Sequence, residues 1–427
     1  MAGTFTSASQ HPSEEFPHTA TRAPARATRI DRWLASRVQQ TMHPAPVRLV
    51  LWDGSSPYAG SAPPVGDLLL HDRRALLGLV FNPDLRFGEA YMSGRLDVRG
   101  PLQRVLDALS RSAAASPSWR ERLSVAFGRA NTLAASRRHV RHHYDLGNDF
   151  YRLWLDADMV YTCAYFPSPD AALEAAQVAK LDRVCRKLRL RRGETVVEAG
   201  CGWGALALHM ARRYGVRVRA FNVSREQLEF ARARAVREGL ANRVEFIDDD
   251  YRNLSGRYDA FVSVGMLEHV GRERFEAFAD VLRRSVGRAS GRGLLHFIGR
   301  DVPRPVNAWI RRRIFPGGYT PTLAEVSTRV LAPAGMSIVD VENLRLHYAR
   351  TLAHWATRFA SAQDAVRSAY GEEFRRAWEL YLAGSQAAFA SGWLQLFQIV
   401  FVPREAAPPF WTRDDPHSAL EAAHDPA

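Results

Sequence analysis

The sequence is poor in cysteine, with only Cys163, Cys185 and Cys201 among its 427 residues. Their spacing matches no zinc or iron–sulfur pattern, so we expect no metal site. Three thiols are also too few for the disulfide framework of a small secreted protein. The shortage of cysteine therefore favours a reducing compartment, and the cytoplasm is the simplest expectation.

Long hydrophobic runs are also missing from the sequence. The longest apolar stretches, such as Trp393–Val402, are too short and too interrupted to span a bilayer. The N-terminal residues are rich in Ser, Thr, Pro and His, and they lack the apolar segment of a secretory signal. We therefore expect residues 1–28 to form a disordered tail.

Acidic residues are outnumbered, with 45 Asp and Glu against 58 Lys and Arg, which gives a net charge of +13. A basic surface implies an anionic partner, either nucleic acid or an anionic membrane, unless the arginines are simply spread over the whole chain. No N/D-P-P-Y-type signature and no RNA-binding module is present, so nucleic acid is not expected. The densest basic clusters are Arg137, Arg138 and Arg141, and Arg311–Arg313.

The chain is too long for one typical domain, so we expect two. Residues 29–110 mix apolar and polar positions as in a small α/β unit, with a strand at Arg48–Trp52 and a turn-rich stretch at Phe87–Val98. Residues 111–136 are rich in Ala, Ser and Arg and predict a linker. A larger domain is expected over residues 137–403, followed by a flexible tail over residues 404–427.

Strands and helices alternate in the larger domain. The pattern predicts helices at Ala171–Leu188 and Ser224–Glu238, and strands at Val216–Phe221, Val244–Asp248, Tyr258–Gly265 and Gly293–Gly299. Residues Thr351–Phe401 are expected to be helical and rich in aromatic side chains. Such alternation predicts an α/β fold with a parallel, doubly wound sheet, which binds ligands at the carboxyl ends of its strands.

The stretch Val196–Met210 combines a strand end, a glycine turn and a helix start. Glu198 is followed by Gly200, Gly202 and Gly204 in the pattern E-x-G-x-G-x-G, whereas a dinucleotide-binding turn has G-x-G-x-x-G and an acid after the second strand. Here the second strand is followed by Asn222. The pattern fits the S-adenosylmethionine pocket of a class I methyltransferase, and the alternative is an ordinary glycine-rich turn.

Seven motifs stand in order along the chain: HYDLGNDFY, YTCAYF, GCGWG, DDYRNL, VSVGMLEHVG, LLHFIG and IFPGG. With them the chain resembles the cyclopropane fatty acyl phospholipid synthases and mycolic acid cyclopropane synthases over about residues 30–400. The resemblance implies a class I methyltransferase domain preceded by a smaller, lipid-binding-like α/β domain. It also implies that S-adenosylmethionine is the methyl donor for the double bond of an acyl chain in a phospholipid.

The resemblance also implies two sets of site residues. Those for S-adenosylmethionine are Tyr161, Thr162, Glu198, Gly200, Gly202, Gly204, Asn222, Gln227, Tyr251 and Arg252. The family usually has Thr at the position of Asn222. Those for a bicarbonate ion, which would serve as the base, are Cys163, Glu268, His296, Ile298 and Tyr348.

The chemistry gives these residues a purpose. An alkene is a weak nucleophile, so its methylation depends on proximity, orientation and a dry site. A base must then remove a proton from the new methyl group before a ring can close. Taken singly, each residue has a simpler interpretation: Cys163, His296 and Tyr348 as core side chains, and Glu268 as an acid at a helix start.

The leading hypothesis is a methyltransferase that forms cyclopropane fatty acids in membrane phospholipids. One alternative gives methylene- or methyl-branched chains by the same cation chemistry, and another is a non-catalytic lipid-binding relative. We expect a cytoplasmic protein, peripherally bound to the anionic inner face of the cell membrane, and a homodimer is compatible with this. The expected docking surface is Arg311–Arg313 together with Ile314 and Phe315.

Overall fold

The computed structural model describes residues 26–60, 63–113, 146–287 and 290–409. The start of the expected N-terminal tail and the end of the C-terminal tail lie outside these ranges. So does most of the expected linker, together with the basic cluster Arg137, Arg138 and Arg141. No helix in the described ranges is both long enough and apolar enough to cross a membrane.

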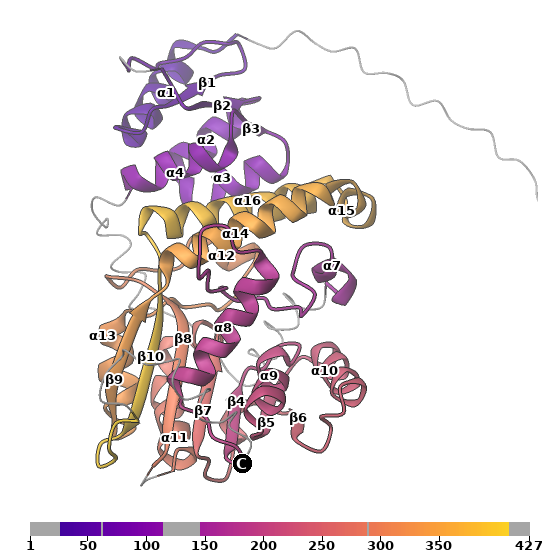
Figure 1. The fold of residues 1–427 in the computed structure, drawn as a ribbon. Coiled ribbons are helices and arrows are strands. Elements are labelled where there is room, and N and C mark those ends of the chain that lie inside the picture. The colour runs from indigo at the N-terminus through magenta and orange to yellow at the C-terminus, as the bar shows by residue number, and fades with distance from the viewer. Residues whose placement is uncertain (1–25, 61–62, 114–145, 288–289, 410–427) are drawn as a thin grey trace, which may run out of the picture.

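The N-terminal residues fold into a small α/β unit (Figure 1). Its sheet has the order β1-β2-β3, in which β1 and β2 are parallel and β3 is antiparallel to β2. Its elements are α1 (Arg29–Met42), β1 (Val47–Val50), β2 (Gly66–Leu70), α2 (Arg73–Phe81), α3 (Pro83–Met92), β3 (Leu96–Arg99) and α4 (Leu102–Ala113). The expected turn-rich stretch Phe87–Val98 is instead the end of α3 and most of β3, because Pro83 and the cap of Asn82 on the Leu85 amide start a helix upstream.

A seven-stranded sheet forms the centre of the larger domain, with the order β6-β5-β4-β7-β8-β10-β9. The first five strands in that order are parallel, and β10 runs antiparallel between β8 and β9. The bounds are β4 (Thr195–Ala199), β5 (Arg217–Asn222), β6 (Val244–Asp248), β7 (Ala260–Val264), β8 (Arg292–Gly299), β9 (Met336–Asn343) and β10 (Gln395–Pro403). The predicted doubly wound sheet is confirmed.

Helices cover both faces of this sheet because buried side chains alternate along its strands. On β4, Val196 packs under one set of helices and Val197 under the other. One face carries α8 (Leu173–Lys187), α9 (Ala205–Tyr214) and α10 (Arg225–Arg237). The other carries α11 (Phe275–Ser285), α13 (Leu323–Val326) and the π-helix η4 (Ser327–Leu331), and short 3₁₀ turns lie at η1 (Tyr251–Asn253), η2 (Leu267–His269) and η3 (Arg272–Arg274).

The expectation of helix throughout Thr351–Phe401 is wrong at its end. Helices α14 (Arg345–Ser361), α15 (Gln363–Tyr370) and α16 (Glu372–Ser391) are present, but the chain then enters the sheet as β10. All nine residues of β10 are buried. A strand buried on both faces has no alternation of polar and apolar residues, so its sequence resembles that of a buried helix.

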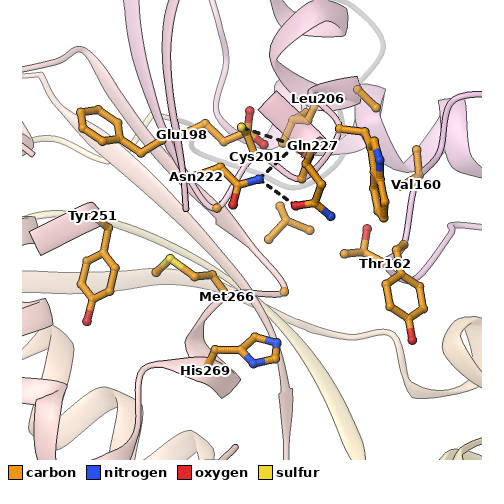
Figure 2. Close-up of a pocket in the computed structure, with 18 of the residues that line it drawn as sticks. Val160, Thr162, Glu198, Cys201, Leu206, Asn222, Gln227, Tyr251, Met266 and His269 are labelled. Carbon is orange, nitrogen blue, oxygen red and sulfur yellow. Dashed lines mark hydrogen bonds between the residues drawn. The ribbon is translucent and has the colours of Figure 1, made fainter. Parts of the chain in front are cut away.

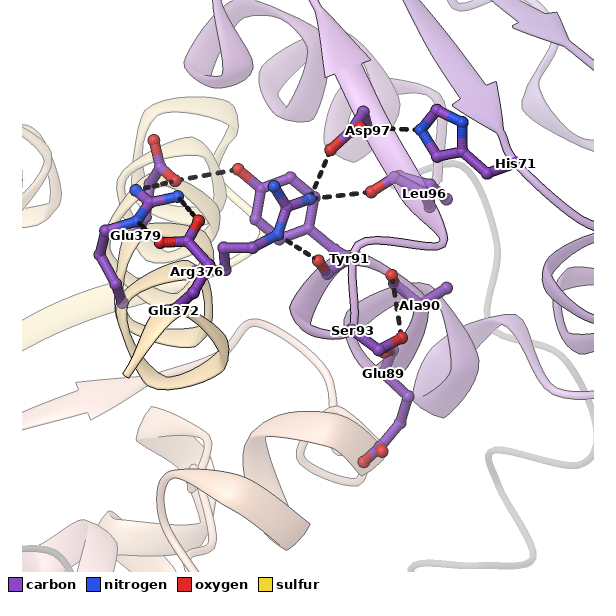
Figure 3. Close-up of polar contacts among 11 residues, drawn as sticks. His71, Glu89, Ala90, Tyr91, Ser93, Leu96, Asp97, Glu372, Arg376 and Glu379 are labelled. Atoms are coloured by element: carbon purple, nitrogen blue, oxygen red, sulfur yellow. Dashed lines mark hydrogen bonds and ion pairs between the residues drawn. The ribbon is translucent and has the colours of Figure 1, made fainter. Parts of the chain in front are cut away.

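The N-terminal unit rests on the layer formed by α14 and α16 (Figure 1). Arg376 of α16 makes three polar contacts with this unit: its guanidinium donates to Asp97 Oδ1 at 2.6 Å and to the carbonyl oxygens of Tyr91 and Leu96 at 2.6 and 3.0 Å (Figure 3). The Tyr91 hydroxyl donates to Glu379 at 3.0 Å. These contacts fix the N-terminal unit against α16, one of the helices that cover this end of the larger domain.

The arginines expected to dock on a membrane form the last turn of α12 (Ala308–Arg313). Arg313 is bound to Glu89 of the N-terminal unit by two hydrogen bonds of 2.8 and 2.7 Å. Ile314 is 4% exposed and belongs to the core. Phe315 is partly buried, with its ring against His269 and Tyr381. Arg311 and Arg312 are therefore the members of the expected surface that are exposed and form no ion pair with the N-terminal unit in the described ranges.

Candidate active site

A pocket opens at the carboxyl ends of β4, β5 and β7, beside the turns that follow them (Figure 2). The expected donor-site residues that line it are Tyr161, Thr162, Glu198, Gly200, Gly202, Asn222, Gln227 and Tyr251. These residues come from separate loops and strands, and the parallel sheet brings them to one edge. The pocket is therefore a single site assembled around the glycine turn.

The glycine turn leaves room for a ligand at its centre. Gly202 has φ of +53°, and no atom lies within 4 Å of the place where a Cβ would stand. Gly204 differs, because a Cβ there would meet the Phe246 ring at 2.7 Å and the Ala231 methyl at 2.9 Å. Gly204 lies outside the pocket lining and lets α9 start close to its neighbours, whereas Gly202 lets a ligand approach the backbone.

The polar side chains at the ends of β4 and β5 differ in their hydrogen bonding: Asn222 has partners among the described residues, whereas one oxygen of Glu198 has none. Asn222 Nδ2 donates to Gln227 Oε1 at 2.8 Å and to the Gly202 carbonyl at 3.2 Å. Glu198 is 2% exposed, and its Oε2 is buried without a hydrogen-bond partner among the described residues. Burial raises the pKa of Glu198 to about 8. An unpartnered carboxylate oxygen of this kind fits the ammonium or a hydroxyl of a ligand.

Arg252, the remaining expected donor-site residue, does not line the pocket. Its guanidinium donates to both carboxylate oxygens of Asp250, at 2.8 and 2.9 Å. Asp250 and the preceding Asp249 do line the pocket, directly after β6. Arg252 therefore positions Asp250, an acidic residue of the pocket wall. Asp250 could have been predicted from the sequence, because it follows a strand and ligands of a parallel sheet lie at the carboxyl ends of the strands.

Three of the expected anion-site residues, Glu268, His296 and Ile298, lie at or near the ends of β7 and β8. Glu268 Oε1 accepts a hydrogen bond from the Ile298 amide at 2.5 Å, so this amide is already occupied. Glu268 Oε2 is buried without a described partner, and burial raises the pKa of Glu268 to about 7. A carboxyl group poised near neutral pH is suited to accept or donate a proton.

His296 stands two residues before Ile298 on β8, so both side chains point to the same side of the strand. Gln398 Nε2 lies 3.0 Å from His296 Nδ1. An amide nitrogen only donates, so Nδ1 accepts and the ring proton sits on Nε2, which is buried without a described partner. Burial lowers the pKa of His296 to about 3, so the ring is a neutral donor.

Cys163 and Tyr348 approach this region through Leu344. The Cys163 thiol is fully buried, with Sγ 4.0 Å from the Leu344 carbonyl, and burial raises its pKa far above the ordinary range. The Tyr348 amide donates to the same carbonyl at 3.1 Å. Leu344 is joined to β10 at Leu396, which pairs with Ile298. These contacts link Cys163 and Tyr348, through Leu344 and β10, to the strand that carries His296 and Ile298. A neutral thiol argues against nucleophilic catalysis by Cys163.

Sequence reasoning overlooked several residues of the pocket wall, namely Lys180, Trp203, Asp249, Asp250, Met266 and His269. Lys180 lies in a helical pattern, where a lysine is usually solvated. Only its neighbours in space show that it is 1% exposed.

Comparison with known proteins places the chain among lipid-modifying methyltransferases. The family described as mycolic acid cyclopropane synthetase matches residues 131–399, and a family described as a domain of unknown function matches residues 35–117. A probable fatty acid methyltransferase of Pseudomonas putida is 38% identical over 392 residues, which is 88% of this chain and 97% of that protein. The cyclopropane-fatty-acyl-phospholipid synthase of Escherichia coli K12 is 35% identical over 351 residues, covering 80% of this chain and 88% of that one.

A solved structure agrees with these sequence matches. The mycolic acid cyclopropane synthase CmaA1, in complex with SAH and CTAB, has a TM-score of 0.58 and 29% sequence identity. The similarity covers 62% of this chain and 97% of that one. The similarity therefore extends over nearly the whole length of that structure.

Proposed function

The chain belongs to the mycolic acid cyclopropane synthetase family of S-adenosylmethionine-dependent methyltransferases, and we propose that it forms cyclopropane fatty acids in membrane phospholipids. The proposed substrate is the double bond of an unsaturated acyl chain that is still esterified in the lipid. The family membership gives the donor and the class of reaction. The acyl substrate and the ring product are the proposal.

The donor pocket has the features that S-adenosylmethionine requires. Its glycine turn is open at Gly202, and Glu198 Oε2 is buried without a described partner. When bound, S-adenosylmethionine supplies an electrophilic methyl group. The protein contributes a buried wall that excludes water and holds the reacting groups in line, which is what a weak alkene nucleophile needs.

The observation that carries the ring proposal is a pair of buried polar atoms, Glu268 Oε2 and His296 Nε2, that have no partner in the part of the chain that the structure describes and lie in an apolar setting. Ring closure requires a group that removes a proton from the added carbon. Glu268, with its pKa near 7, suits that task. A bicarbonate ion also fits, since His296 Nε2–H would donate to it, and the ion would supply a further proton acceptor.

A second product is supported by the relative from Pseudomonas putida, which is described only as a fatty acid methyltransferase. Loss of a different proton would leave a methylene branch. A methyl branch would then require a separate reductase that supplies hydride and a proton to the methylene group. Both routes share the donor pocket and the first transfer.

We propose that the protein reaches its substrate by binding the surface of an anionic membrane. The net charge of +13 supports this, as do the exposed Arg311 and Arg312. Each basic residue near an anionic surface contributes about 1 kcal/mol. A cytoplasmic protein at the inner face of the cell membrane is the arrangement that fits this chemistry.

Mass spectrometry of lipids from cells that express the chain tests the product. We expect unsaturated phospholipids to gain the mass of one CH₂ group. Ozone then cleaves a methylene-branched product and leaves a cyclopropane product intact. An unchanged lipid profile with a donor-binding protein would refute the proposal, and cells expressing Glu268→Gln provide the matched control.

A further inference from the structure

Lysine is rare in this chain, and its positions are unusual. Of the 58 lysines and arginines, only Lys180 and Lys187 are lysines, and both lie on α8. Lys187 forms ion pairs with Glu342 at 2.7 Å and Asp340 at 3.3 Å. Lys180 is 1% exposed, yet no carboxylate of the described residues forms an ion pair with it. A buried ammonium without a direct counter-ion is costly and calls for an explanation.

Lys180 faces the donor pocket. It belongs to the pocket lining, and its Nζ donates to Thr162 Oγ1 at 2.9 Å. Burial lowers the pKa of Lys180 to about 8, against the opposing charges of Asp156 and Glu198. Asp156 is already engaged, because it accepts from the Asp158 and Val160 amides at 3.1 and 3.0 Å.

The contact between Lys180 and Thr162 fixes the direction of the Thr162 hydroxyl. An ammonium group has three donors and no acceptor, so Thr162 Oγ1 must accept from Lys180. The hydroxyl proton of Thr162 then points elsewhere, and Thr162 lines the pocket (Figure 2). A hydroxyl polarised by a neighbouring cation is a good donor to a carboxylate.

Glu198 supplies an acidic group to the same pocket. Its Oε2 is buried and has no partner among the described residues. The pocket wall therefore presents a directed hydroxyl backed by a cation, and a carboxyl oxygen without a partner among the described residues. The amino-acid portion of S-adenosylmethionine carries a carboxylate and an ammonium, which complement these two groups.

We propose that Lys180 is a positioning residue of the donor site, which orients Thr162 and supplies the positive charge that balances the carboxylate of the bound donor. Glu198 receives the donor's ammonium, so the pocket recognises both charges of the amino-acid portion. The inference rests on S-adenosylmethionine as the donor and is independent of the acyl product. Lys180 also lies near enough to Cys163 and His296 for its charge to affect their pKa values, so an effect confined to the anion site is the competing role.

Calorimetry with two ligands separates these roles. S-adenosylhomocysteine carries the amino-acid portion, and 5′-methylthioadenosine keeps the adenosine and sulfur but lacks that portion. For Lys180→Met we expect affinity for S-adenosylhomocysteine to fall by about tenfold or more, the range of one charge-assisted hydrogen bond. Affinity for 5′-methylthioadenosine should stay within about twofold of wild type. Lys187→Met, which removes the other lysine of the same helix, should change neither affinity.

If Lys180→Met does not fold, variants of Thr162 test the same arrangement, in which Lys180 orients the Thr162 hydroxyl toward the donor. Thr162→Val should lose affinity for S-adenosylhomocysteine selectively, and Thr162→Ser, which keeps the hydroxyl, should restore it. Equal loss for both ligands would show a collapsed pocket and overturn the inference. Unchanged affinity for both ligands would also overturn the inference. If turnover were then lost, the result would assign Lys180 to the anion site, and if turnover were normal, Lys180 would have no role in either site.

Discussion

Replacing Glu268 with Gln should alter the stability of the protein in a way that depends on pH. Burial raises the pKa of Glu268 from 4.5 to about 7, so the folded protein holds a proton there that the unfolded chain releases. Stability therefore falls as pH rises from about 4.5 to about 7, and is level above that range. The full difference is up to about 3 kcal/mol, at about 1.4 kcal/mol per pH unit.

Gln keeps an oxygen that accepts from the Ile298 amide, and it cannot ionise. The variant therefore does not lose the stability that wild type loses when Glu268 ionises. About 1 kcal/mol or less of the cost is present at pH 5 and nearly all of it at pH 8. The stability of Glu268→Gln relative to wild type should thus rise by about 2 kcal/mol between these pH values. The buried amide of the glutamine in the variant has its own effect on stability, but this effect is the same at both pH values and cancels when the two stability differences are compared. Turnover at pH 8 should be almost lost.

Urea denaturation of both proteins at pH 5 and pH 8 measures the effect. Glu342→Gln is the matched control. Burial alone would raise the pKa of Glu342, but hydrogen bonds from Arg183 and the charge of Lys187 hold it at about 2. Its contribution is lost only as pH falls from about 4.5 toward 2, so Glu342→Gln should destabilise equally at pH 5 and pH 8. A Glu268→Gln difference that does not change between the two pH values would refute the reasoning.

Three further outcomes are expected. His296→Ala should keep S-adenosylhomocysteine affinity in calorimetry and lose most turnover, because it removes a buried Nε2–H that has no partner among the described residues and is free to hold the base. Near-normal turnover would remove His296 from the mechanism. Gly202→Val should abolish donor binding, since it puts a side chain into the open cradle at a φ of +53°, and undiminished affinity in a folded variant would contradict the pocket assignment. Joint replacement of Arg311 and Arg312 by Gln should weaken sedimentation with anionic vesicles by about tenfold or more at low salt, and much less at high salt. If the variant and wild type sedimented equally at low salt, Arg311 and Arg312 would be excluded as the membrane-docking surface.

The sequence predicted the architecture wherever local patterns are strong. Alternating strands and helices located the doubly wound sheet, and the observed β6 has the predicted bounds Val244–Asp248. The pattern failed at β10, where burial on both faces removes the period of two. It also failed at Phe87–Val98, because two glycines obscured a helix that begins at Pro83.

The pocket shows a similar division. The sequence alone predicted that Glu198 and Gly202 lie in one site, because they belong to a continuous strand, turn and helix. No residue far away in the chain is needed to bring them together. Only the tertiary structure decided that Lys180 faces inward, that Glu268 occupies the Ile298 amide, and that Arg313 is held by Glu89. These facts depend on contacts between residues far apart in the chain. Hydrophobic periodicity specifies which face of an element is buried, but not which side chain of another element it will meet.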